Sequence, residues 1–355
     1  MSAPLKNPDQ GYLPLYHTIR GESIESVHFG TVVVVEPSGK LFAWHGNPDT
    51  ASFLRSSAKP FQAIPLVELG GMEAFQISQA ELALTCGSHS GTDHHLRTLH
   101  RLQQKIRVSD KDLLCCTHQP FHQGTRSILR DRGEQPTPNH HNCSGKHTGM
   151  LAQSKLLQAD LKNYTEIQHP VQQHILSVLA DMCCLDQSGI QYGRDGCSVP
   201  TFAMPLYHAA WGWARLTNPD GISEKRQTAC KMITSAMTSY PFLVAGPGRL
   251  DTRLMECSEG KIISKVGAEA FQAAGILENA LYPGSPALGI ALKISDGDQG
   301  KRAKRAVMIE VLRQLNVLSA DQIEGLTDFG PELPNRNQCD ILIGIGKPCF
   351  QLQYS

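Results

Sequence analysis

The sequence predicts a protein of the α+β class, folded as a single domain over residues 1–355. Two observations support this class. Apolar β-branched runs typical of strands alternate with amphipathic runs typical of helices, and no internal repeat, low-complexity tract or linker divides the chain. A chain of 355 residues can bury a large hydrophobic core, as one large domain or as two closely packed lobes.

The first expected elements are a hairpin and a helix. Residues 31–36 and 40–44 are apolar and β-branched, and the Pro-Ser-Gly at 37–39 predicts a hairpin turn between them. Apolar positions after Pro60 favour a helix that the glycines at 70–71 would end. Two further helices are expected, one over 79–86 and one that begins at the polar caps 90–93 and ends near 106.

The rest of the chain continues the mixture. Residues 118–142 are rich in Pro, His, Gln and Arg without a clear period, so we expect a long ordered loop, a kind of segment that often carries function. Ser319 opens a capping box for a late helix. Helices are expected over 150–157, 171–184 and 223–240, and the last third alternates strand-like and helical runs at 261–266, 269–277, 288–294, 300–315 and 340–346.

Charge and hydropathy exclude several classes of partner. Lys+Arg and Asp+Glu both number 33, and no basic stripe or acidic tail stands out, so neither nucleic acid nor a membrane surface is an expected partner. The longest apolar runs are too short to span a bilayer. Residues 1–6 lack the apolar stretch of a secretory signal, and we therefore expect a cytoplasmic protein.

The cysteine and histidine counts are high. Eleven cysteines are an odd number for a disulfide framework, and without an export signal most are expected to be reduced and buried. Several of the fifteen histidines lie in polar runs, where solvated side chains are the simplest expectation. Any special role must therefore be argued residue by residue.

Ser56 and Lys59, in the stretch R-S-S-A-K-P-F-Q, have the spacing of a hydroxyl nucleophile and its base. On a helix they would share a face, with Cβ atoms roughly 5–6 Å apart, and Ser56 would lie near a helix start that favours a developing anion. Lowering a lysine pKa from about 10.4 to about 7–8 costs roughly 3–5 kcal/mol, so the base needs burial or a second cation nearby. The alternative is a capping serine and a solvated lysine, and Ser258 and Lys261 repeat the spacing at an expected turn.

Two cysteine clusters are candidates for metal or thiol chemistry. Cys143, in N-C-S-G-K-H, is followed by Lys146 and His147, which suits a reactive thiolate, part of a soft-metal site, or a turn into the next helix. Cys197, in D-G-C-S-V-P, is either an ordinary buried residue of a tight turn or a second metal ligand. The paired C-x-x-C pattern of common zinc sites is absent.

Three further motifs contain titratable or nucleophilic residues. Ser88 lies in C-G-S-H-S-G, where His89 is either a base or a solvent-facing loop residue. K-V-G-A-E places Lys265 at a strand end and Glu269 at an expected helix start, where the helix dipole alone would favour a carboxylate. The D-G-D at 296–298 lacks the later ligands of an EF-hand loop and predicts a turn.

Taken in order, these motifs together with A-G-P-G-R resemble those of the Rhizobium-type, zinc-binding L-asparaginases, from Arg55 to Glu269. The resemblance implies a fold similar to serine β-lactamases and penicillin-binding proteins, with an antiparallel sheet packed with helices, commonly in a homodimer. It also implies hydrolysis of L-asparagine to L-aspartate and ammonia.

The resemblance also implies roles for individual residues. Ser56 with Lys59 and Ser88 with Lys265 would be two catalytic pairs, with Ser56 as the nucleophile and Lys59 kept neutral by burial and by Lys265. The substrate's charged groups would be held by Arg55, Asp195 and Glu269, and one zinc ion by Cys143, Lys146 and Cys197. The chain departs from the family pattern at Phe29, Ser198 and Ala270.

Two other functions stay open. S-x-x-K also serves β-lactamase-like hydrolases and esterases of other acyl groups, although the K-T-G and S-D-N motifs of those enzymes are not obvious here. A non-catalytic amino-acid-binding or zinc-dependent regulatory relative could keep the same pocket. The retained Ser and Lys positions argue for an enzyme.

Overall fold

The computed structural model describes residues 11–355, so the expectation about a signal at residues 1–6 lies outside the described part. The described chain forms two compact units. A sheet unit contains residues 11–57, 203–218 and 253–355, and a helical unit contains residues 58–202 and 219–252. Whether these two units together form the single domain expected over residues 1–355 stays a prediction.

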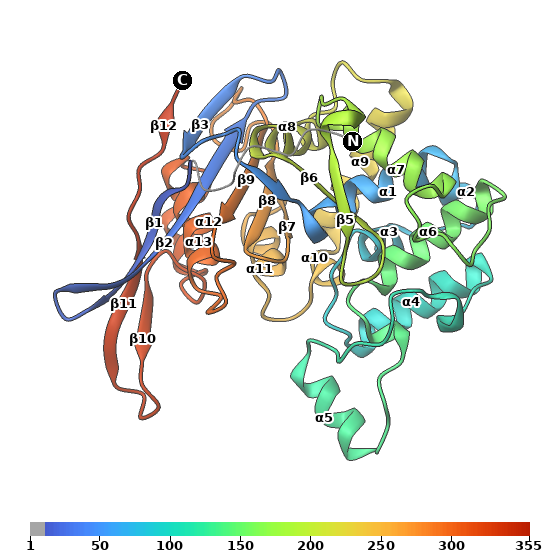
Figure 1. Ribbon diagram of the computed structural model, residues 1–355, viewed down its shortest axis with the longest axis horizontal. Coiled ribbons are helices and arrows are strands. Elements are labelled where there is room, and N and C mark those ends of the chain that lie inside the picture. Colours follow the sequence, from blue (N-terminus) through green and yellow to red (C-terminus); the bar gives the residue numbers. More distant parts are fainter. Residues whose placement is uncertain (1–10) are drawn as a thin grey trace. The chain divides into compact units, whose positions relative to one another are not determined.

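The sheet unit is built on an antiparallel sheet, which confirms the predicted α+β class (Figure 1). Seven strands follow the order β10-β11-β1-β2-β9-β8-β7, and β3 pairs with β2 and with β12. The predicted hairpin is confirmed, because Val33 of β2 pairs with Trp44 of β3. The strands are β1 (Leu13–Arg20), β2 (Ser23–Val35), β3 (Leu41–His45), β7 (Ile262–Val266), β8 (Phe271–Ile276), β9 (Leu288–Ile294), β10 (Leu333–Arg336), β11 (Leu342–Pro348) and β12 (Gln353–Tyr354).

The core of this unit lies along the central strands. The valines at 32–35 of β2 are all fully buried, which requires covering elements on both faces of the strand. Helix α8 (Leu206–Thr217) packs on β2, β8 and β9, and α12 (Ala303–Gln314) packs on β1, β9 and β11. A short strand β4 (Ala51–Phe53) pairs with residues 203–205 of β6 (Pro200–Pro205), and α13 (Ala320–Glu324) follows the capping box predicted at Ser319.

The helical unit is arranged around α1 (Lys59–Glu68), which contacts α3, α6, α7 and α9. Nine of the ten residues of α1 are buried, as expected for a central helix. Its other elements are α2 (Gly71–Ala74), α3 (Gln79–Thr85), α4 (Asp93–Ile106), α5 (Gln123–Asp131), α6 (Ser144–Leu156), α7 (Pro170–Met182), β5 (Gln191–Arg194), α9 (Glu224–Ser239) and α10 (Pro241–Val244), while α11 (Leu250–Cys257) crosses the boundary between the units.

Three local expectations need correction. The expected loop at 118–142 contains α5, a nine-residue helix whose two strongly apolar residues, Ile128 and Leu129, are adjacent. Helix α6 begins at Ser144 rather than near 150, because its polar first turn is buried. Residues Arg55–Ala58 form a 3₁₀ turn and the α-helix begins only at Lys59, so Ser56 precedes the helix. Within residues 11–355, no helix has the length and apolar character needed to cross a membrane.

Candidate active site

Lys59 and Ser88 meet inside the helical unit. Lys59 is 1% exposed and Ser88 is 2% exposed. The Lys59 Nζ donates to Ser88 Oγ at 2.9 Å, to the Gly87 carbonyl at 2.6 Å and to the Asn142 carbonyl at 3.4 Å. The three acceptors match the three protons of an ammonium group, and all three are uncharged oxygens.

Burial lowers the pKa of Lys59, and the nearby positive charge of Lys146 lowers it further, although Cys143 and Cys197 oppose the shift. A lysine that loses its proton more easily can accept one from a hydroxyl, which is the property a general base needs. The condition set by the sequence, a buried lysine with a second cation nearby, is met within this unit by Lys146.

The segment after α3 fixes the position of Ser88. Helix α3 is capped by Ser78 and Glu81 at its start and ends at Thr85, and the chain then runs extended toward α4. The Ser88 backbone N–H donates to the Val244 carbonyl at 2.7 Å. This backbone bond leaves the Ser88 hydroxyl as the group that meets Lys59.

His89 is not the solvent-facing residue that its loop position allowed. It is fully buried, its Nδ1 accepts the Gly91 N–H at 3.2 Å, and its Nε2 lies 2.8 Å from Ser144 Oγ. Burial lowers its pKa well below the usual value, and the nearby charges of His95 and Lys59 lower it further. Both ring nitrogens are engaged, so His89 supports the loop and is not available as a base for Ser88.

Cys143, Lys146 and Cys197 also come together in the helical unit. Cys143 is the N-cap of α6, and Lys146 lies one turn further on. The close approach of α6 to α3 depends on Gly145, because a Cβ there would lie 2.5 Å from the Leu84 carbonyl oxygen. Lys146 Nζ lies 3.0 Å from Cys197 Sγ, and the three side chains are all buried.

The charges of this cluster are strongly coupled. A hydrogen bond from Cys197 and the charges of Lys59 and Lys146 hold the pKa of Cys143 well below its usual range, against the effect of burial. The hydrogen bond to Cys143 raises the pKa of Cys197, and burial adds to this effect. Burial lowers the pKa of Lys146, but the charges of Cys197 and Cys143 more than offset it and raise the pKa overall. These shifts favour a thiolate at Cys143 beside the ammonium group of Lys146.

Two sulfurs and one amine nitrogen are a donor set that suits zinc, provided that Cys197 and Lys146 lose their protons on binding. Among residues 11–355, no group of three or more His, Cys, Asp or Glu side chains is placed to hold a metal ion. A metal ion at Cys143 and Cys197 would thus depend on the lysine as its third protein ligand. Asp195 lies in the same turn as Cys197, where its Oδ1 accepts the Gly196 N–H at 2.8 Å.

The other four predicted residues lie in the sheet unit. Arg55 has a positive φ of 51°, and the half-buried Ser56 follows it in the 3₁₀ turn. Lys265, on β7, is fully buried and donates to the Val266 carbonyl at 3.1 Å, whereas Glu269 is exposed in the β7–β8 turn. This turn approaches the start of the R-S-S-A-K motif, since a Cβ at Gly267 would lie 2.7 Å from the Leu54 carbonyl oxygen.

The structure thus connects residues that the sequence assigned to different pairs. The sequence paired Ser56 with Lys59 and Ser88 with Lys265, and both pairings stay predictions. The contact between Lys59 and Ser88 and the role of the Asn142 carbonyl were missed. The one signal for them was that Cys-Gly-Ser and Asn-Cys-Ser are both polar, turn-forming stretches beside apolar helices.

Comparison with known proteins gives one family and several structures. Residues 16–343 match the family described as L-asparaginase II. No curated protein is significantly similar to the chain in sequence. Among solved structures, the chain is similar to Mglu, with 13% identity, a TM-score of 0.42, and 82% of this chain and 68% of that chain covered.

Two other structures are similar in the same range. A probable glutaminase from Bacillus subtilis, complexed with 6-diazo-5-oxo-L-norleucine, has 12% identity and a TM-score of 0.40, with 81% of this chain and 85% of that chain covered. A β-lactamase from Mycobacterium bovis has 15% identity and a TM-score of 0.43, with 81% and 95% covered. The chain spans 60–68% of the length of the Mglu chains it matches.

Proposed function

Because the chain belongs to the L-asparaginase II family, we propose that it hydrolyses the side-chain amide of L-asparagine to L-aspartate and ammonia. The family makes it an amidohydrolase. The observation that supports the chemistry most directly is the buried contact between Lys59 Nζ and Ser88 Oγ at 2.9 Å. Burial and the charge of Lys146 lower the pKa of Lys59 against the opposing effect of Cys143, which favours a base over a structural cation.

The proposed reaction has two halves. In the first, neutral Lys59 takes the Ser56 proton while Ser56 Oγ attacks the amide carbon, and the C–N bond then breaks as Lys59 returns the proton to the leaving ammonia. In the second, water attacks the aspartyl ester and restores the Ser56 hydroxyl. The Ser88 hydroxyl positions the Lys59 amine by a hydrogen bond. Lys265 is the cation of the second predicted pair.

The zinc-binding subtype is part of this proposal. The residues that would hold the ion are Cys143, Lys146 and Cys197, and zinc would supply positive charge and a fixed position for a bound group. Arg55, Asp195 and Glu269 would bind the α-carboxylate and α-ammonium groups of the substrate. A homodimer and a cytoplasmic location remain predictions.

Ammonia release should be measured side by side from L-asparagine and L-glutamine, with hydrolysis of a chromogenic β-lactam as a third assay. We expect turnover of asparagine, and its loss in Ser56→Ala and in Ser88→Ala. The matched control is Ser258→Ala, which removes the serine of the second S-x-x-K at no predicted site. Asparagine turnover that survives in a folded Ser56→Ala variant would exclude Ser56 as the nucleophile.

Two results would favour the other functions. Faster hydrolysis of the β-lactam than of either amide would indicate a β-lactamase-like hydrolase. Binding of asparagine without any turnover would indicate an amino-acid-binding relative. Metal analysis of the purified protein compares Cys197→Ser with Cys339→Ser, which changes an exposed cysteine of the sheet unit. The zinc proposal requires bound zinc to be lost only in the first variant.

A further inference from the structure

The sheet unit contains a cavity that uses none of the residues assigned to catalysis. Its volume is about 520 Å³, within the range of small-molecule sites. Residues of β1, β10, β11 and α12 line it, and the chain after α13 completes it. The lining residues that matter below are Tyr16, Arg302, Arg305, Asp328, Glu332 and Gly346.

Three buried donors in this cavity lack a hydrogen-bond partner. They are the hydroxyl of Tyr16, which is fully buried, and the Nε atoms of Arg302 and Arg305. Buried polar atoms without a protein partner are satisfied by ordered water or by a ligand, and three of them gather at this one cavity. Burial raises the pKa of Tyr16 to about 12, although the charges of Arg302 and Arg305 lower it. The Tyr16 hydroxyl is therefore a neutral donor close to two cations.

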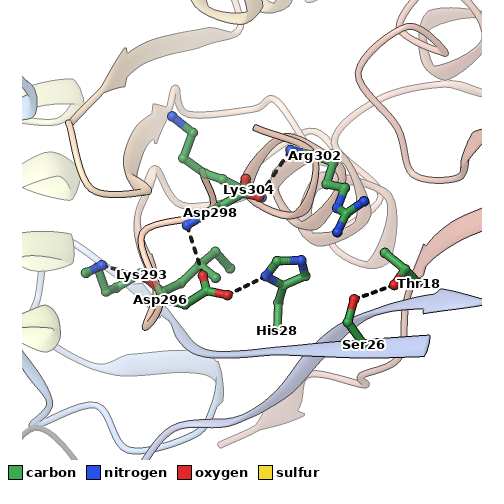
Figure 2. Close-up of polar contacts among 9 residues, drawn as sticks. Thr18, Ser26, His28, Lys293, Asp296, Asp298, Arg302 and Lys304 are labelled. Atoms are coloured by element: carbon green, nitrogen blue, oxygen red, sulfur yellow. Dashed lines mark hydrogen bonds and ion pairs between the residues drawn. The ribbon is translucent and has the colours of Figure 1, made fainter. Parts of the chain in front are cut away.

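The backbone leaves room for the Tyr16 hydroxyl. A Cβ at Gly346 of β11 would lie 1.9 Å from this oxygen, so the strand can pass only as glycine. Asp298, the carboxylate nearest to the two arginines in sequence, already accepts hydrogen bonds from the backbone. Asp298 accepts the backbone N–H groups of Arg302 at 3.2 Å and Lys304 at 3.0 Å, as Figure 2 shows.

The charges around the cavity differ in sign and in exposure. The two arginines are half-buried, whereas Asp328 and Glu332 are exposed. Guanidinium groups with a hydroxyl donor recognise a carboxylate, and exposed carboxylates recognise an ammonium group. The same acidic side chains disfavour a ligand that carries negative charge alone.

We propose that this cavity binds a small α-amino acid as a zwitterion. Arg302, Arg305 and Tyr16 hold its α-carboxylate, and Asp328 and Glu332 hold its α-ammonium group. The site is separate from the residues assigned to catalysis, and it does not require that the protein hydrolyse asparagine.

Equilibrium dialysis with L-aspartate tests the site on the full chain. The Arg302→Gln/Arg305→Gln variant should bind one L-aspartate fewer per chain than the wild type, whether or not the active site also binds this ligand. Tyr16→Phe should weaken binding at the cavity by about fivefold to tenfold, because it removes one hydrogen bond and little else. The control is Lys301→Gln, which removes an exposed cation beside Arg302 and should change nothing.

Comparison ligands separate a zwitterion from a plain anion. Succinate, which lacks the ammonium group, and inorganic phosphate should each bind the cavity at least about tenfold more weakly than L-aspartate. Asp328→Asn/Glu332→Gln should abolish that preference. An unchanged number of L-aspartate sites in the arginine variant, or succinate or phosphate binding as tightly as L-aspartate, would overturn the proposal. If the arginine variant does not fold, Tyr16→Phe decides, and unchanged affinity in that variant counts against the site.

Discussion

Helix α1 begins with a buried lysine, Lys59, and ends with a buried glutamate, Glu68, and the pKa values of these two groups are set in different ways. At its first residue, Lys59 donates to uncharged oxygens, and burial lowers its pKa although Cys143 and Cys197 oppose the shift. At its last residue, Glu68 accepts hydrogen bonds from Arg226 at 2.7 Å and lies 3.7 Å from His174. Burial opposes ionisation of Glu68, but these partners prevail and lower its pKa to about 2. Both residues are buried, but burial prevails at Lys59 whereas the charged partners prevail at Glu68.

This difference assigns Lys59 to the reaction and Glu68 to the stability of the fold. A buried lysine whose pKa is lowered by desolvation costs folding free energy and is retained where its proton is needed. A buried pair such as Glu68 with Arg226 has no proton to exchange near neutral pH and holds α1 against α9.

The largest expected effect is at the first end. Lys59→Met should reduce turnover of asparagine by roughly a thousandfold, since loss of a general base costs about 10²–10⁴ in rate. The stability of the folded state should change little, because the cost of burying the amine is removed together with its hydrogen bonds and its attraction to Cys143. Steady-state kinetics and thermal unfolding measure the two effects.

Lys261→Met is the matched control, since Lys261 is the exposed lysine of the second S-x-x-K. It should keep normal turnover. A Lys59→Met protein that is folded and active would remove the basis for calling Lys59 the base.

At the other end, Glu68→Gln should destabilise the protein by up to about 3 kcal/mol, because Arg226 then keeps only the more exposed Asp181 as a counter-ion. Turnover per folded molecule should not change. Denaturant unfolding measures the loss, and Glu25→Gln, which breaks an exposed pair with Arg20, should show no measurable change. Equal stability of Glu68→Gln and the wild type would show that the pair only offsets its own desolvation.

The pH dependence of stability follows from the same residue. A carboxyl group whose folded pKa lies below its unfolded value stabilises the fold above the unfolded pKa and loses that contribution as the pH falls. For Glu68 the loss spans pH 4.5 to about 2 and amounts to roughly 3 kcal/mol. Unfolding measured across this window should show the loss in the wild type and a smaller slope in Glu68→Gln. Identical slopes would contradict the assignment.

The pH dependence of activity should depend on Lys59, which must lose its proton to work, and not on Glu68. Lys59 works as a base only when neutral, so kcat/KM should rise as the pH increases through its lowered pKa. That rising limb should begin well below the pH at which an ordinary lysine titrates. A limb at the ordinary lysine range would show that Lys59 is charged in the free enzyme.

The smallest expected effect concerns two turns where the chain departs from the family pattern. Ser198 and Ala270 have φ of 76° and 54°, in the left-handed region that glycine adopts without strain. Ser198→Gly and Ala270→Gly should each stabilise the protein by up to about 1 kcal/mol, less the entropy that glycine adds to the unfolded chain. Thermal unfolding of the single variants checks this, and destabilisation of both would show that the side chains make favourable contacts.

Local patterns in the sequence predicted most elements, because their causes are local. The hairpin at 31–44 and the capping box at Ser319 depend on residues a few positions apart. Helix α5 was missed because only Thr125 and Leu129 are buried in it. Its two strongly apolar residues, Ile128 and Leu129, are too few to show a helical period in the sequence.

The candidate site was predictable only in its parts. Each motif drew attention to its own residues, but the contact between Lys59 and Ser88 joins positions 29 residues apart. The cavity at Tyr16 had no sequence signal, since it joins β1 to α12 through a tyrosine and two arginines that look ordinary in isolation. Spacing reveals neighbours on one element, and only the packing of elements reveals neighbours between them.

The position of β2 in the sheet has a consequence for synthesis of the chain. Val33 of β2 pairs with Ala291 of β9. One edge of β2 therefore has no partner until the ribosome has added a further 258 residues. At synthesis rates of about 5–20 residues per second, the delay is roughly 10 to 50 seconds. During that interval an edge with four consecutive valines lacks its final partner, which is the kind of surface that chaperones shield. A nascent chain stalled before β9 should therefore be more prone to aggregate than one stalled after it.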